Sequence, residues 1–140
     1  MQIPLRSICT GYLQRYGPMN IRDLQYNRCI IFPLDTKAAK ALDNGQADER
    51  CSIDMIKLNF STVSKLYILG FFGTFLSGSN YSPPEMLSFS VHQSNISDII
   101  DSALKIRKET RDKELLQIID KFVERAKRSI NNDLPILFNI

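Results

Sequence analysis

Residues 96–130, ISDIIDSALKIRKETRDKELLQIIDKFVERAKRSI, decide the fold class of this chain. Apolar side chains recur there every three or four residues, which is the period of an amphipathic helix. The first predicted helix has an apolar face made of Ile96, Ile99, Ile100, Ala103, Leu104 and the aliphatic stem of Arg107. The second, which Thr110 can cap, has an apolar face made of Leu115, Leu116, Ile119, Phe122, Val123, Ala126 and Ile130. The stretch therefore predicts two long helices, each with one face on a core.

Shorter helices are predicted towards the N-terminus. Residues 4–16 have helical periodicity and are followed by Gly17-Pro18, which ends a helix because Gly accepts the left-handed conformation and Pro cannot continue. A short helix is expected over 21–24, and another over Lys37–Asp43, capped by Asp35 or Thr36.

The apolar stretch that follows Ser61 and Thr62 predicts one more helix, capped by one of these two residues and extending to Phe75. Its apolar face should include Val63, Leu66, Tyr67, Phe71 and Phe75. Gly70 and Gly73 have no side chains, so one side of this helix is expected to be narrow enough for close packing.

Alternation and β-branched residues predict about three short strands. They cover 29–32, 51–60 and 87–91, and the second carries a bulge because its apolar phase changes between Met55 and Ile56. The apolar tail 134–138 should pack as a terminal strand or tuck. We therefore expect one compact domain over 1–140, of the α+β class and mainly helical, with about five helices.

Composition excludes several classes of protein. The chain has 140 residues, of which 44% are hydrophobic and 24% charged, so an intrinsically disordered chain is excluded. Its longest apolar run, 66–76, is shorter than the roughly 20 residues of a membrane span, and the N-terminus does not look like a signal peptide. The cysteines Cys9, Cys29 and Cys51 fit neither a disulfide framework nor a metal knuckle, which predicts free thiols and a cytoplasmic location.

The chain offers little catalytic chemistry. Its one histidine, His92, has no metal-ligand partner at suitable spacing and is expected at the surface or at a helix cap. The carboxylate pairs at Asp98 and Asp101, and at Asp120 and Glu124, are interpreted as salt-bridged exposed positions. We expect no enzyme activity, no metal and no cofactor.

A compact domain of this kind is expected to act by presenting a surface to a protein partner. Candidate surfaces are the loop 77–84 with Tyr81, since tyrosine is favoured at interfaces, and the charged face of 111–130. The densest acidic cluster consists of Asp43, Asp48, Glu49 and Asp54. We expect an inhibitor or immunity-type protein that neutralises a toxin or enzyme. The net charge of +3 then requires an acidic partner surface or a contact through this acidic cluster.

A second hypothesis comes from residues 5–60. Helix 5–16 followed by Gly17-Pro-Met-Asn-Ile-Arg-Asp-Leu24 resembles the opening of winged helix-turn-helix DNA-binding domains. The resemblance implies that Lys37-Ala-Ala-Lys-Ala-Leu42 is the recognition helix, with Lys37 and Lys40 directed to DNA, and that a wing begins within 45–60.

Overall fold

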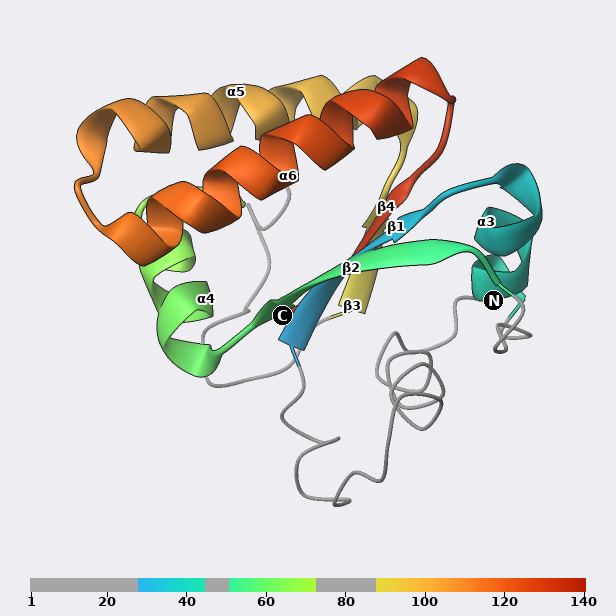
Figure 1. The fold of residues 1–140 in the computed structure, drawn as a ribbon, viewed down its shortest axis with the longest axis horizontal. Coiled ribbons are helices and arrows are strands. Elements are labelled where there is room, and N and C mark those ends of the chain that lie inside the picture. The colour runs from blue at the N-terminus through green and yellow to red at the C-terminus, as the bar shows by residue number, and fades with distance from the viewer. Residues whose placement is uncertain (1–27, 45–50, 73–87) are drawn as a thin grey trace.

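The computed structural model describes residues 28–44, 51–72 and 88–140, which form four strands and four helices (Figure 1). In chain order these are β1 (Arg28–Pro33), α3 (Thr36–Asp43), β2 (Ile53–Leu58), α4 (Phe60–Ile68), β3 (Ser88–Val91), α5 (Gln93–Glu109), α6 (Lys113–Asn131) and β4 (Ile136–Asn139). The predicted helix-rich α+β class is confirmed, with a fourth strand beyond the three expected. The helices expected over 4–16 and 21–24 lie outside the described residues.

The four strands form one antiparallel sheet in the order β2-β1-β4-β3. The strand closest to the C-terminus, β4, is therefore central, and the tail predicted as a strand or tuck is a strand. Strands β1 and β2 pair without interruption from Arg28 opposite Leu58 to Pro33 opposite Ile53, so the predicted bulge is wrong. Met55 and Ile56 are both apolar because both faces of the sheet are covered: Ile56 packs in the main core and Met55 in a second cluster.

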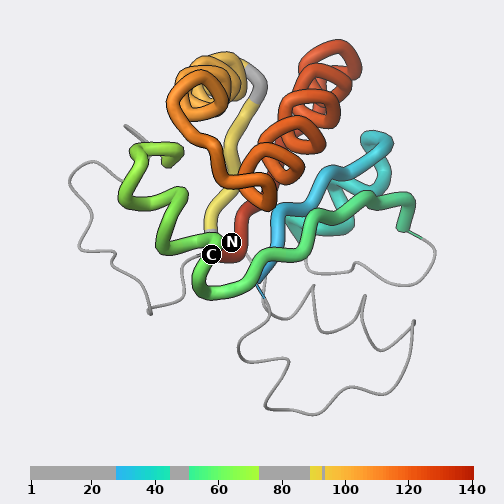
Figure 2. The backbone as a smooth tube through the Cα atoms, turned by 60° about the vertical axis from the view of Figure 1, so that its left-hand side comes forward, coloured from blue at the N-terminus to red at the C-terminus, as the bar shows by residue number. Residues whose placement is uncertain are grey.

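Helices α5 and α6 cover one face of the sheet (Figures 1 and 2). The core between the two layers is centred on Phe122, which is fully buried. Its ring centroid lies 5.1 Å from that of Phe71 and 6.1 Å from those of Phe32 and Phe138. These residues come from α6, from the segment after α4, and from the two central strands, so one aromatic cluster joins all of these parts.

The opposite face of the sheet carries a smaller apolar cluster. Cys29, Ile31 and Leu137 are buried there together with Leu42 of α3. Helix α3 begins as predicted, because Asp35 caps it by accepting a 2.6 Å hydrogen bond from the backbone N–H of Ala38.

Cys29 corrects one expectation from the sequence. It is disulfide-bonded, whereas Cys51 is free, so the prediction of free thiols holds for Cys51 and is wrong for Cys29. The sequence argument considered only cysteine count and spacing, and neither reports which residues the fold brings together.

We predict different labelling of these two cysteines in the purified protein. Alkylation in denaturant without reductant should modify Cys51 and leave Cys29 unmodified, and reductant should make Cys29 reactive. Peptide mass spectrometry measures both sites in one sample. Complete alkylation of Cys29 without reductant would contradict the disulfide.

Helix α4 is shorter than predicted and is capped by a different residue. It ends at Ile68, because Gly70 has a φ of +82° and the N–H of Phe71 returns to the carbonyl of Leu66 at 2.9 Å. This is a Schellman motif, which turns Phe71 back into the core. A Cβ at Gly70 would meet no atom within 4 Å, so this glycine supplies a backbone conformation and the predicted close packing is wrong here. Gly73 and Phe75 lie outside the described residues.

The two long helices differ from the prediction in detail. In α5 the predicted residues Ile96, Ile99, Ile100 and Ala103 are buried, but the last turn buries Ile106, and Leu104 is 36% exposed. Helix α6 is capped by Asp112, which accepts from the backbone N–H of Glu114 at 3.0 Å and of Leu115 at 3.2 Å, so Thr110 is not its cap. None of the helices in the described ranges has the length and apolar character that crossing a membrane requires.

Candidate functional site

The predicted acidic cluster is only partly visible. Asp43 is exposed at the last residue of α3, whereas Asp48, Glu49 and Tyr81 lie outside the described residues. Asp54 lies in β2, where its Oδ2 is 2.9 Å from Arg125 Nε and 3.1 Å from Arg128 Nη2. Two arginines of α6 thus compensate the charge of Asp54, which joins α6 to β2 and contributes little negative potential to a partner.

The residues implied in DNA binding occupy α3 and the strand after it. Lys37 and Lys40 are exposed on α3, while Ala38, Ala39 and Leu42 are buried on its inner side. In the segment 45–60, where a wing was expected to begin, β2 pairs back onto β1 and leads directly into α4.

His92 lies at the N-cap of α5, directly after β3, as the sequence indicated. It is exposed and makes no side-chain capping hydrogen bond. No group of three or more His, Cys, Asp or Glu residues suitable for a metal ion occurs within 28–44, 51–72 and 88–140.

Helix α4 carries the most pronounced apolar surface of the described residues. Its inner side is formed by Thr62, Val63 and Leu66, all buried. Of the six large exposed hydrophobic residues in the described ranges, four lie on α4 or at its C-cap. We call them the α4 strip: Phe60 (49% exposed), Tyr67 (37%), Ile68 (79%) and Leu69 (42%). Scattered apolar residues are ordinary on a protein surface, but a cluster of them on one short helix is typical of an interaction site.

The α4 strip was not predicted from the sequence. Tyr67 was predicted on the core face of a helix extending to Phe75, Phe60 was predicted at the end of the strand 51–60, and no exposed role was predicted for Ile68 or Leu69. A usable signal was present in Gly70, which marks a helix end. With the end at Ile68, three consecutive apolar residues, 67–69, span the last turn and cannot all face inward.

The first residue of the α4 strip rests on a buried cation. Arg28, at the start of β1, is 2% exposed, and its Cζ lies 5.5 Å from the centroid of the Phe60 ring. This cation–π contact holds one side of the ring and leaves the other half of the side chain in solvent.

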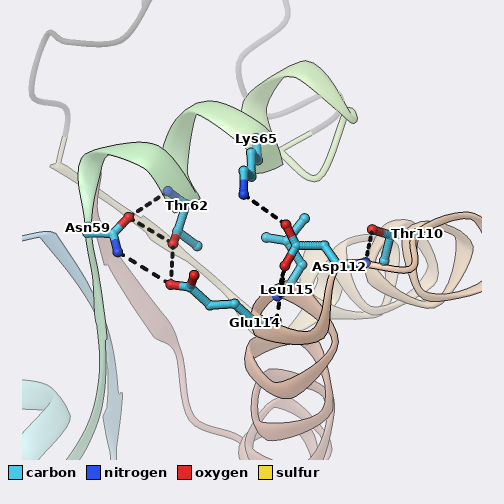
Figure 3. A network of polar contacts seen from close by, with 7 residues as sticks. All are labelled: Asn59, Thr62, Lys65, Thr110, Asp112, Glu114 and Leu115. Atoms are coloured by element: carbon cyan, nitrogen blue, oxygen red, sulfur yellow. Dashed lines mark hydrogen bonds and ion pairs between the residues drawn. The ribbon is translucent and has the colours of Figure 1, made fainter.

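A network of polar contacts fastens α4 to the N-terminus of α6 (Figure 3). Asn59 caps α4 by accepting a 2.7 Å hydrogen bond from the backbone N–H of Thr62, in place of the predicted Ser61 or Thr62. The Thr62 hydroxyl shares its one hydrogen between Asn59 Oδ1 at 2.9 Å and Glu114 Oε1 at 3.2 Å. The same Glu114 oxygen accepts from Asn59 Nδ2 at 3.4 Å, so the caps of α4 and the first turn of α6 share one set of contacts.

An ion pair reinforces this junction. Lys65 Nζ lies 2.8 Å from Asp112 Oδ2. The hydrogen bond from Lys65 is the main cause that lowers the pKa of Asp112, followed by the one from the backbone N–H of Leu115. The hydrogen bond to Asp112 likewise raises the pKa of Lys65. Asp112 therefore remains charged while it caps α6 and binds α4.

Polar contacts with α6 hold one edge of α4, and the main core holds its buried side. Asn59, Thr62 and Lys65 bind α6, while Val63 and Leu66 pack in the main core. The position of α4 is therefore fixed by its contacts with α6 and the core, and its exposed residues are presented on an ordered backbone.

Comparisons of the chain with models of known protein families, with curated proteins and with solved structures found no match.

Proposed function

We propose that the protein is a non-enzymatic protein-binding module, an inhibitor or immunity-type protein that neutralises a partner toxin or enzyme, and that the α4 strip is its contact surface. The observation that carries this proposal is the exposure of Ile68, 79%, among the apolar residues of the α4 strip on an anchored helix.

The chemistry of the α4 strip suits a protein partner. Aromatic and aliphatic side chains that enter a pocket on a partner provide most of the binding energy of typical protein interfaces. Phe60 and Tyr67 supply two large rings, and Ile68 and Leu69 supply aliphatic anchors beside them. Because the polar network already orders α4, binding would require little further ordering of its backbone.

The α4 strip replaces the acidic cluster as the main contact in this proposal. Asp54 is compensated by Arg125 and Arg128, which leaves Asp43 as the exposed acidic member among the described residues. DNA binding remains the alternative because Lys37 and Lys40 are exposed on α3. It receives less support, since the strand after α3 pairs with β1 and leads into a helix where a second wing strand would be needed.

The proposal does not depend on the compartment. A cytoplasmic location was expected from free thiols, and the disulfide bond at Cys29 is more typical of an oxidising compartment. The α4 strip lies on a different part of the fold from Cys29, which packs with Ile31 and Leu137 on the opposite sheet face. Binding through the strip is therefore proposed for either location.

The test compares two variants that each replace an exposed aliphatic residue with glutamine. We expect Ile68→Gln to weaken binding to the captured and purified partner by about 10- to 100-fold, the range for a central interface residue. Leu34→Gln is the matched control, because Leu34 is 40% exposed and lies between β1 and α3. Figure 1 shows α3 at the opposite end of the sheet from α4. The affinity of Leu34→Gln for the partner should equal that of the unchanged protein. Isothermal titration calorimetry gives both dissociation constants, and inhibition of the partner is measured in parallel.

Two results would contradict the proposal. One is equal affinity of Ile68→Gln and Leu34→Gln for the partner. The other is steeply salt-dependent binding to duplex DNA that is lost in Lys37→Ala and Lys40→Ala, which would support the DNA-binding alternative.

A further inference from the structure

A dense group of basic side chains lies at the junction of α5 and α6. We call residues 105–113, KIRKETRDK, the basic turn; its five basic residues are Lys105, Arg107, Lys108, Arg111 and Lys113, against the acidic Glu109 and Asp112. All five basic residues are exposed. Residues 101–130 contain nine basic and six acidic side chains, and five of the nine basic ones lie in the basic turn, at one end of the helical layer.

Most of these charges have no ion-pair partner among residues 28–44, 51–72 and 88–140. Arg107 pairs with Asp120 at 2.6 Å, and Asp112 pairs with Lys65 of α4 at 2.8 Å. The other four basic residues form no ion pair with any residue that the structure describes: Lys105, Lys108, Arg111 and Lys113. Within the described residues, the basic turn therefore carries four positive charges without an ion-pair partner and one exposed carboxylate, that of Glu109.

The basic turn is adjacent to α4. The 2.8 Å contact between Lys65 and Asp112 joins the two directly, and the 3.2 Å contact between Thr62 and Glu114 lies one turn away (Figure 3). Both backbone views place α4 beside the α5–α6 junction (Figures 1 and 2). Ile68 and Leu69 follow Lys65 by three and four positions and so neighbour it on the helix surface, which places this end of the α4 strip next to the basic turn.

We propose that the partner presents an apolar groove bordered by acidic side chains, with the groove on the α4 strip and the acids on the basic turn. This inference rests on the proposed function and specifies the chemistry of the partner. An interface of this kind has an apolar centre that provides affinity and a charged rim that selects the partner. A partner with basic residues around the same groove would be repelled by Lys108 and Arg111.

The two parts of the surface should have separable kinetic signatures. The apolar centre controls the dissociation rate, because leaving it exposes buried surface to water. The basic turn, which stays at the solvent-exposed rim, acts mainly on the association rate and makes it dependent on salt. Removal of two of its charges should slow association by about threefold to tenfold at low salt and by less at high salt.

The test uses phage-displayed random 16-residue peptides selected on the intact protein. We expect enriched peptides that combine apolar residues with Asp or Glu, because such peptides offer apolar surface to the α4 strip and carboxylates to the basic turn. Surface plasmon resonance of a synthesised consensus peptide should give slower association with Lys108→Gln/Arg111→Gln. The control Lys37→Gln/Lys40→Gln removes the same charge from α3 and should leave the rate unchanged.

The outcomes separate this inference from the proposed function. Peptides that require Ile68 but lack acidic residues, with association unaffected by Lys108→Gln/Arg111→Gln, would overturn the acidic partner and leave the α4 strip supported. Peptides that bind Ile68→Gln as well as the unchanged protein would overturn both. If a duplex DNA probe binds the unchanged protein and Ile68→Gln but does not bind Lys108→Gln/Arg111→Gln, the basic turn is a phosphate-binding site. This result would overturn the inference.

Discussion

Deletion of residues 134–140 is expected to abolish cooperative folding. This segment supplies β4, which lies between β1 and β3 and is the only link between them in the described sheet. Its five apolar residues other than proline are buried: Leu134, Ile136, Leu137, Phe138 and Ile140. At about 1.5–3 kcal/mol for each buried side chain, their loss removes roughly 10 kcal/mol, which equals the whole stability of a typical domain.

Urea denaturation followed by circular dichroism measures this effect. The shortened chain should show no cooperative transition, while Phe138→Ala, which keeps the strand, should unfold cooperatively at lower urea. A transition of the shortened chain with the slope of the full chain would show that β4 is dispensable, and it would refute the central position of this strand.

The second large effect is expected for Phe122→Ala. The Phe122 ring is fully buried and contacts the rings of Phe32, Phe71 and Phe138, so its removal leaves a cavity at the meeting point of α6 and the sheet. Substitutions of this kind cost about 3–5 kcal/mol of unfolding free energy.

Phe60→Ala is the matched control for that variant. Phe60 is 49% exposed and loses only part of its packing together with the cation–π contact to Arg28, a loss of about 1 kcal/mol. Chemical denaturation of both variants measures the difference between their free energies of unfolding. Equal destabilisation by the two substitutions would contradict the central role of the Phe122 cluster.

The long helices were predicted well because their evidence is local. The period of apolar residues in 96–130 gave both helices, seen at Gln93–Glu109 and Lys113–Asn131. Asp35 was identified as a possible cap of α3 from its position before the helix. In each case the decisive interactions join residues three or four positions apart, so the pattern is visible along the chain.

The candidate site was predicted poorly because it depends on distant residues. Asp54 belonged to an acidic cluster in the sequence, and in the fold it pairs with Arg128, 74 positions away. The α4 strip became visible only when the helix end at Ile68 and the contacts of α4 with α6 were known. Linear spacing contains no information about such pairings.

The sequence by itself determined the α+β class, the two long amphipathic helices and the location of the basic excess, because helical period and charge are properties of neighbouring residues. Only the tertiary structure decided that the tail 136–139 is a central strand, that Cys29 is disulfide-bonded, and that an apolar strip lies beside a basic turn. The physical reason is that burial and charge compensation depend on which surfaces meet in space, and the residues that form those surfaces lie far apart along the chain.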